Sequence, residues 1–298
     1  MKDTLRVLPC FKQVESISTI PSGLSQHCFK IHADNNIYFA KTIEDNTEIS
    51  VTACAGKSSL SPNIIYHDQH WLISRFIEAD NLALSTLHTD EKIDYSIRLM
   101  VKCHQLDIKP VELSPKEIIN SLLKNPYYSR LQTKVLLAFT DLIIMPVDET
   151  KKGVCCHGDL NFGNVLIDLA QRTWLVDYEC ACTAPIEYDL AMFIAVNGLA
   201  SNKISVIIEQ YQIQSSVIVD PLLLNSYLRF SYFINALWYF NSYHEEIHTE
   251  RKQALLKHAE KQCDALRTSL ELVDSPLLSR LSSKLTDILT TFDFSNQT

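Results

Sequence analysis

The hydrophobic pattern of this chain changes its period near residue 80. Up to about residue 78, short apolar segments alternate with polar turns, which is typical of β-strands. Beyond residue 80, apolar residues recur every three or four positions, as on the buried stripe of a helix. A brief return to the strand period lies between residues 153 and 178. The sequence therefore predicts an α+β fold with a small antiparallel-sheet lobe, residues 1–78, and a large, mainly helical lobe, residues 79–298.

The turn and capping residues sharpen this prediction. Asp34 and Asn35 tolerate positive φ and suit a hairpin. The one helix of the small lobe is expected to begin near Asn46 and to end at Gly56 as a left-handed C-cap, and Ser114 is expected to open a helix through a capping box. The expected strands are 11–20, 28–32, 37–42, 64–67, 71–77, 154–157, 164–168 and 173–178. The other expected helices are 93–104, 127–144, 186–197, 203–213, 221–243, 249–270 and 276–291.

Glycine is scarce, with only six residues in 298. A Rossmann fingerprint needs three glycines within six residues, and no such triplet occurs. A Walker A loop is also absent, because Val51 stands where the first glycine before Gly56-Lys57-Ser58 is required. Two common nucleotide sites are thus excluded.

Charge and cysteine content exclude further classes of function. The net charge of −8 repels phosphate backbones, so we expect no nucleic-acid partner. The nine cysteines are odd in number and show no disulfide framework, and no secretory signal or membrane-length apolar segment is visible. We therefore expect a cytoplasmic protein with reduced thiols and no membrane partner.

Polar residues with a fixed spacing follow the strand at residues 154–157. Asp159 and Asn164 stand five positions apart, and Asp177 ends a later apolar strand. Phosphoryl transfer from Mg-ATP needs a carboxylate that accepts the hydroxyl proton and oxygen ligands that hold the metal ion against the phosphates. This spacing is that of a kinase catalytic loop with its second metal ligand. An isolated Asp and Asn at this spacing more often form a simple turn, so the kinase interpretation requires Asp159, Asn164 and Asp177 together.

The segment from Cys156 to Ala191 resembles the phosphotransferase family of aminoglycoside, choline, ethanolamine and thiamine kinases, which has a protein-kinase-like fold. The resemblance rests on His157-Gly158-Asp159, Val176-Asp177-Tyr178-Glu179 and Tyr188-Asp189-Leu190-Ala191. It implies that Asp159 is the catalytic base, that Asn164 and Asp177 hold Mg²⁺, that His157 orients the loop and that Asp189 is a structural brace.

The same resemblance implies an ATP site in the small lobe. Lys41 would contact the α- and β-phosphates, and Glu48 would position it from the helix. A phosphate loop would include Ser22, Gly23 and Ser25, and the backbone of Phe76 and Ile77 would meet adenine. The loop contains one glycine where a cluster is usual. Only eleven residues separate Asp177 from Asp189, which leaves no room for the activation loop of a protein kinase.

The acceptor is expected to be a small, cationic alcohol of the choline, ethanolamine or thiamine type. Glu179 and Glu187, with the aromatic rings of Trp238 and Tyr239, would suit an ammonium or thiazolium group. Packing of these rings in the core is an equally good interpretation. An aminoglycoside or fructosamine-type kinase is the alternative within the family.

Two hypotheses from other classes stay open at this point. A binding module that keeps the fold without catalysis would still contain Lys41 and Asp159. A zinc peptidase would use His244 and His248 of a His-Glu-x-x-His pattern, with Glu245 as base. A solvated helix is the favoured interpretation of that pattern. Cys155 and Cys156 are expected to pack rather than bind metal, because neighbours on a strand face opposite ways, and His104 is expected to be a core histidine.

Overall fold

The computed structural model describes residues 1–20, 27–43, 46–143 and 152–271. These residues form two compact units. Unit 1 comprises Met1–Glu112, Gly153–Ala184 and Glu209–Val217, and unit 2 comprises the other described residues. Both units are discontinuous in sequence, so the predicted lobe boundary at residue 78 does not coincide with a division between them. The assignment of nucleotide binding to 1–78 and of catalysis to 79–298 stays a prediction.

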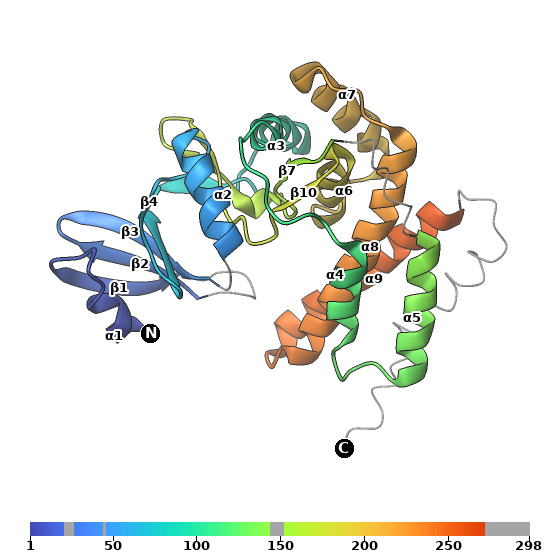
Figure 1. Ribbon diagram of the computed structural model, residues 1–298, viewed down its shortest axis with the longest axis horizontal. Coiled ribbons are helices and arrows are strands. Elements are labelled where there is room, and N and C mark those ends of the chain that lie inside the picture. The colour runs from blue at the N-terminus through green and yellow to red at the C-terminus, as the bar shows by residue number, and fades with distance from the viewer. Residues whose placement is uncertain (21–26, 44–45, 144–151, 272–298) are drawn as a thin grey trace. The chain divides into compact units, whose positions relative to one another are not determined.

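Unit 1 is built on a five-stranded antiparallel sheet in the order β1-β2-β3-β5-β4 (Figure 1). Two smaller sheets, β6-β8-β9 and β10-β7, belong to the same unit. Its elements are α1 (Lys2–Arg6), β1 (Val14–Ile20), β2 (Cys28–Ala33), β3 (Asn36–Thr42), α2 (Asn46–Lys57), β4 (Ile64–His67), β5 (Trp71–Arg75), β6 (Ala79–Asn81), α3 (Thr89–His104), β7 (Val154–Cys156), the 3-10 turn η1 (Phe162–Asn164), β8 (Val165–Asp168), β9 (Thr173–Leu175) and β10 (Cys182–Ala184).

The predicted hairpin between β2 and β3 is confirmed. Asp34 and Asn35 adopt φ values of 51° and 61° and pair Ala33 with Asn36 across the turn. The Asp34 carboxylate also accepts hydrogen bonds from the backbone N–H groups of Lys12 and Gln13, which lowers its pKa. A side chain chosen for turn geometry thus also ties the N-terminal segment to the sheet.

A short N-terminal helix, α1, covers one face of this sheet and was not predicted. Leu5 is fully buried, and it packs with Phe29, Ile31, Trp71 and Ile73 in one apolar cluster. Five helical residues are too few to show a 3.6-residue period, so the sequence pattern gives no signal for this helix.

Two predicted caps are wrong. Gly56 lies inside α2, which ends at Lys57, and Ser59 is the residue with positive φ. Gly56 has no left-handed backbone, and a Cβ there would lie 2.9 Å from Asn63 Oδ1, the end of an exposed side chain that would have to move. Helix α4 does begin at Pro115, but the Ser114 side chain makes no capping hydrogen bond.

Unit 2 is helical, and its centre is the long helix α8, which packs against α6 and α9 (Figure 1). Asp220 caps α8 by accepting hydrogen bonds from the N–H groups of Leu222 and Leu223, and Pro221 is its first residue. Helix α6 is buried almost all round, which explains its lack of a polar face. Its elements are α4 (Pro115–Leu123), α5 (Arg130–Ile143), α6 (Ile186–Val196), the 3-10 turn η2 (Ser201–Lys203), the first part of α7 (Ile204–Ser215), α8 (Pro221–Glu245) and α9 (Thr249–Glu271).

Most predicted elements are present with shifted ends. Gly198, with φ of 58°, follows α6 as expected for a helix stop, whereas the expected helix at 276–291 lies outside the described residues. In the described part of the chain, no helix is long and apolar enough to cross a membrane. The cytoplasmic location stays a prediction.

Candidate active site

Lys41 is the charged centre of the candidate site. It lies near the end of β3 with 5% of its surface exposed, and its Nζ forms ion pairs with the carboxylates of Glu48, on α2, and Asp177, 136 residues further along the chain. Burial disfavours the ammonium, but the two carboxylates outweigh burial and raise the pKa of Lys41. Lys41 therefore stays protonated and joins the sheet, the helix and the segment after β9.

Glu48 depends on this contact. It is 3% exposed, and burial raises its pKa against the opposing effect of Lys41. A buried carboxylate without a cation would be costly, so the pair holds α2 at the sheet only while both partners are present. The predicted pairing of Lys41 with Glu48 is thus present in the structure.

Asp177 has an unusual backbone for a residue that is not glycine, with φ of 72°. This left-handed conformation costs free energy, which the surrounding contacts must offset, and such residues are often found at functional sites. The turn follows β9 and the Val176 N–H donates to the Asn164 carbonyl, so the Asp177 segment lies beside the catalytic loop. Its side chain stays 37% exposed and can meet a ligand.

Asp159 and Asn164 lie together in the loop between β7 and β8. The side-chain N–H of Asn164 donates to the backbone carbonyl of Asp159 at 2.9 Å and to its Oδ2 at 3.3 Å, and Asn161 donates to the same Oδ2 at 2.9 Å. Burial raises the pKa of Asp159 to about 7, the two amides oppose the shift, and the carboxylates of Asp177 and Glu179 add to it. A carboxyl group with a pKa near 7 suits the role of general base predicted for Asp159.

His157 is fully buried and connects the two segments that contain Asp159 and Asp177. Its Nδ1 accepts from the Asp159 N–H at 3.3 Å, so the proton is on Nε2, which donates to the Val176 carbonyl at 3.0 Å. These contacts fit the predicted orienting role. Both hydrogen bonds go to backbone groups, and the orienting role of His157 stays a prediction.

Position 158 requires glycine, for a reason that cannot be read from the sequence pattern. Its φ is 77°, and a Cβ there would lie 2.2 Å from the carbonyl oxygen of Cys180. Only glycine permits both this backbone and this approach. The loop between β7 and β8 thus packs directly against the segment that follows Asp177.

The oxygen atoms of Asn164 and Asp177 fit a magnesium site. Mg²⁺ prefers hard oxygen ligands and is commonly held by one or two protein groups together with phosphates and water. The Asn164 amide directs its N–H group at Asp159, which leaves its carbonyl oxygen turned away as a possible ligand. We therefore keep both residues as the proposed metal ligands.

The proposed nucleotide contacts are only partly described. Ser22, Gly23 and Ser25 lie outside the described residues. Phe76 follows β5, and its backbone N–H donates to the Ile37 carbonyl, so Phe76 would meet adenine through its carbonyl or ring. Ile77 comes next and is partly buried.

The proposed acceptor residues are divided between the two units. Glu179 is in unit 1, and its charge acts on both Asp159 and Glu48. Glu187 is buried on α6 in unit 2, where its Oε1 accepts from the Asp220 N–H at 2.9 Å. In the same unit Trp238 is 39% exposed, and Tyr239 stacks on His258 with 5.1 Å between ring centroids. Their role in binding acceptor stays a prediction.

The zinc-peptidase hypothesis does not fit the structure. Helix α8 ends at Glu245, so His244 and His248 are not on one continuous helix. The favoured interpretation as a solvated helix also needs correction, because His244 packs in unit 2, where its ring stacks on Tyr127 at 4.4 Å.

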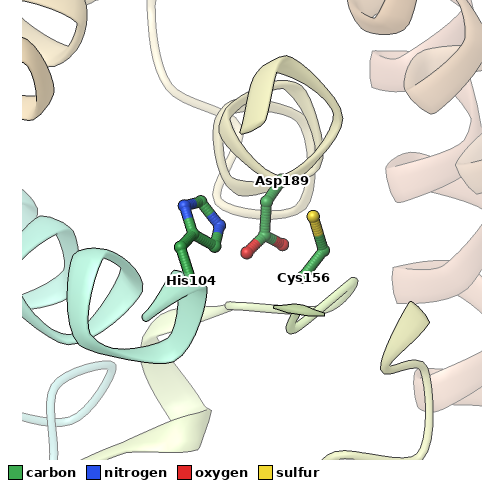
Figure 2. A group of neighbouring side chains, drawn as sticks. All are labelled: His104, Cys156 and Asp189. Atoms are coloured by element: carbon green, nitrogen blue, oxygen red, sulfur yellow. The ribbon is translucent and has the colours of Figure 1, made fainter. Parts of the chain in front are cut away.

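The two cysteines of β7 are buried as expected, whereas His104 is only partly buried. Cys155 and Cys156 are both buried on β7, and the Cys103 thiol donates to the Cys155 carbonyl. None of the nine cysteines, all within the described ranges, forms a disulfide. His104 ends α3 and Cys156 lies on β7, as Figure 2 shows, and His104 Nδ1 is hydrogen-bonded to the Tyr211 hydroxyl at 2.7 Å.

Comparison with known protein families gives a match to the segment that contains the loop between β7 and β8. The model of the APH family, described as a phosphotransferase enzyme family, matches residues 120–211, which include Asp159, Asn164 and Asp177. The matched segment, 92 of the 298 residues, is similar to this phosphotransferase family. No curated protein matches the sequence.

Solved structures of phosphotransferases share the fold. Choline kinase LicA from Streptococcus pneumoniae is 17% identical, with a TM-score of 0.65 over 84% of this chain and 94% of that chain. A choline/ethanolamine kinase family protein from Mesorhizobium loti is 16% identical, with a TM-score of 0.63 over 95% and 98%. Spectinomycin phosphotransferase APH(9)-Ia, in complex with ADP and spectinomycin, is 17% identical, with a TM-score of 0.56 over 94% and 96%. At this identity the likeness confirms the kinase-like α+β fold.

The sequence spacing predicts the group of Asp159, Asn164 and Asp177, whose roles stay predictions, whereas the residues that pack beneath this group have no such signal. Ser61 and Tyr178 share a buried hydrogen bond beneath the site, at 2.9 Å between their hydroxyl oxygens. A serine in a loop has no sequence signal for such a role, and Tyr178 was noted only as part of the family motif.

Proposed function

We propose that this phosphotransferase moves the γ-phosphoryl group of ATP to the hydroxyl group of a small, cationic alcohol of the choline, ethanolamine or thiamine type. The observation that carries the proposal is the joining of Lys41, Glu48 and Asp177 beside the loop that contains Asp159. All four residues lie in unit 1, and together they offer a base, a fixed cation and an exposed carboxylate.

The residues of the chain divide the work of the reaction. Asp159 Oδ2 is held by Asn161 and Asn164, so Oδ1 would accept the proton of the acceptor hydroxyl. The oxygen of that hydroxyl forms the new bond to the γ-phosphorus while the bond between the γ-phosphorus and the bridging oxygen of ADP breaks. Asp159 then releases the proton to solvent, and Lys41 holds the α- and β-phosphates.

A magnesium ion bound at Asn164 and Asp177 would neutralise charge on the phosphates. The protein would contribute two oxygen ligands, from Asn164 and Asp177, held in fixed positions. Asp177 would be fixed by its left-handed backbone, and Asn164 would be fixed by the two hydrogen bonds that its side-chain N–H group donates to Asp159.

The charge around Asp159 supports a cationic acceptor. Asp177 and Glu179 both raise the pKa of Asp159, which means that their negative charges reach the position where the acceptor hydroxyl would lie. Such a concentration of carboxylates attracts cations. The same charge would also suit an aminoglycoside, so that class is the second candidate.

The proposal is tested by coupled measurement of ADP release with Mg-ATP and a panel of acceptors. The panel contains choline, ethanolamine, thiamine, an aminoglycoside and a fructosamine, and a neutral sugar serves as the uncharged control. We expect acceptor-dependent ADP release with one of the cationic alcohols and a loss of about 10²- to 10⁴-fold in Asp159→Ala. Equal turnover in Asp159→Ala would rule out the mechanism. Binding of Mg-ATP without turnover on any acceptor would instead support a non-catalytic module.

A further inference from the structure

Two buried hydroxyl groups lie beneath the candidate active site. The Oγ of Ser61 and the phenolic oxygen of Tyr178 are 2.9 Å apart, and both residues are almost completely buried. Ser61 also donates to the Leu175 carbonyl at 2.5 Å. Because serine has a single hydroxyl proton, Tyr178 must donate to Ser61 while Ser61 donates to Leu175.

This hydrogen-bond chain fastens the loop after α2 to the strand that leads to Asp177. The Leu175 N–H donates to the Leu60 carbonyl at 2.9 Å, so residues 60 and 61 hold Leu175 through both of its backbone groups. Helix α2, which contains Glu48, ends only a few residues before this loop. These buried hydrogen bonds therefore help to fix the position of α2 relative to Asp177.

Tyr178 also reaches the catalytic loop. Its ring lies 4.8 Å from the ring of His157, and His157 holds the backbone N–H of Asp159. One side chain thus contacts the loop after α2 through its hydroxyl and the Asp159 loop through its ring. It directly follows Asp177 in sequence.

We propose that Tyr178 and Ser61 are positioning residues, which couple helix α2 to the catalytic loop and keep Glu48, Asp177 and Asp159 in register. The effect on turnover rests on the proposed phosphotransferase function, whereas the coupling itself does not. Lys41 needs both of its carboxylate partners within ion-pair distance. The hydroxyl pair supplies a second, uncharged fastening between the elements that bear those partners.

The variant Tyr178→Phe isolates the hydroxyl contact. It keeps the ring against His157 and leaves Ser61 free to donate to Leu175, so the Leu175 carbonyl keeps its partner and only the Ser61 oxygen loses a donor. Ser61→Ala is harsher, because it leaves both the Tyr178 hydroxyl and the Leu175 carbonyl without this partner. If the two residues act as one unit, the double variant will lose less activity than the two single losses combined.

Tyr128→Phe is the matched control. Tyr128 is also buried, and its hydroxyl donates to Asn241 Oδ1 at 2.8 Å, but both residues lie in unit 2. Each variant therefore removes one buried tyrosine hydroxyl with one strong hydrogen bond. A general loss of stability should affect both alike.

The experiment combines kinetics with hydrogen exchange of the full chain. We expect Tyr178→Phe to lower kcat by about tenfold, with a smaller change in KM for ATP, because the catalytic groups are misplaced rather than removed. We also expect faster amide exchange in α2 and in residues 156–160. Tyr128→Phe should show a comparable change in Tm with neither of these effects.

The two readouts separate this inference from the proposed function. If the wild-type chain turns over no acceptor, exchange in α2 still decides whether the hydroxyl pair couples the two elements. The inference is overturned if Tyr178→Phe and Tyr128→Phe show the same exchange in α2, or if kcat of an active chain is equal in the two variants. Additive losses in the Ser61→Ala and Tyr178→Phe double variant would likewise contradict it.

Discussion

The catalytic segment of unit 1 and helix α8 of unit 2 differ in how they use polar and aromatic residues. In unit 1, charged side chains far apart in sequence meet through defined ion pairs and hydrogen bonds around Lys41 and Asp159. In α8, aromatic residues pack the helix against its neighbours, and the acceptor-binding role expected of Trp238 and Tyr239 stays a prediction. Phe240 is 1% exposed, and Tyr239 stacks on a histidine of α9.

The two regions differ in how strictly their residues are constrained by sequence. The phosphoryl-transfer groups depend on fixed spacing and on backbone positions that few residues can occupy, such as Gly158 and Asp177. Acceptor choice has no such local constraint, because a ring on α8 can pack or bind with the same sequence pattern. The two regions should therefore respond differently to substitution.

The largest effect is expected from Lys41→Met. The substitution removes the proposed phosphate contact and leaves the carboxylates of Glu48 and Asp177 without their Lys41 partner. We expect kcat/KM for ATP to fall on the order of 10²- to 10³-fold and the free energy of unfolding to fall by about 3–5 kcal/mol, as for a broken buried ion pair. Steady-state kinetics and thermal unfolding measure the two effects.

Lys57→Met is the control for this prediction. Lys57 is an exposed lysine at the end of α2, in the same unit, and the substitution changes the net charge by the same amount. The kcat/KM for ATP and the free energy of unfolding should stay near the wild-type values. An equal loss in the two variants would show that net charge, rather than the buried pair, is responsible.

The glycines give the second comparison between the units. Gly158→Ala should lower the free energy of unfolding by about 3 kcal/mol or more, because the new Cβ is strained and overlaps the Cys180 carbonyl. Gly198→Ala, at a positive φ with nothing within 4 Å, should cost only about 1 kcal/mol. Chemical denaturation of both variants tests the difference. Equal losses would mean that the loop moves to admit the methyl group.

The pH dependence tests the role assigned to Asp159. Its pKa is raised to about 7, so the basic form increases through neutral pH and kcat/KM should rise about tenfold per pH unit below 7. Between about pH 4 and 7 the unfolded chain loses this proton before the folded chain does. Ionisation of Asp159 therefore lowers stability as pH rises through the window in which it raises activity.

Glu48→Gln separates this titration from that of the neighbouring buried carboxylate. The acidic limb of the pH profile should persist in the residual activity of this variant, with kcat/KM reduced at every pH. A profile that becomes flat in Glu48→Gln would assign the titration to Glu48 and would contradict the proposed base.

Much of the catalytic region could be predicted from the sequence because its signals are local. The spacing of Asp159, Asn164 and Asp177 is short, and the period changes mark the sheet and the helices. Lys41 and Glu48 were placed by resemblance to the family, and the structure brings both into contact as that resemblance implies. The shared fold confirms the predicted architecture, and the family match at 120–211 includes Asp159, Asn164 and Asp177, whose roles stay predictions.

The errors arise where tertiary packing overrides local preference. Gly56 is a good C-cap by type, but α2 continues to Lys57 and the positive φ falls at Ser59. His244 and His248 match a metal motif by spacing, yet the helix ends between them. The buried contact of Ser61 with Tyr178 spans more than one hundred residues, and no local pattern encodes it.

The smallest effect is expected from Trp238→Ala, which tests whether α8 contributes to acceptor binding at all. Trp238 is 39% exposed, so its loss should lower the free energy of unfolding by about 1 kcal/mol or less, whereas Phe240→Ala should cost about 3–5 kcal/mol. If Trp238 contacts a cationic acceptor, Trp238→Ala will raise KM for that acceptor several-fold without changing KM for ATP, because a cation–π contact is worth about 0.5–2 kcal/mol. An unchanged acceptor KM would exclude Trp238 from the acceptor site and would leave Glu179, Glu187 and Tyr239 as candidates.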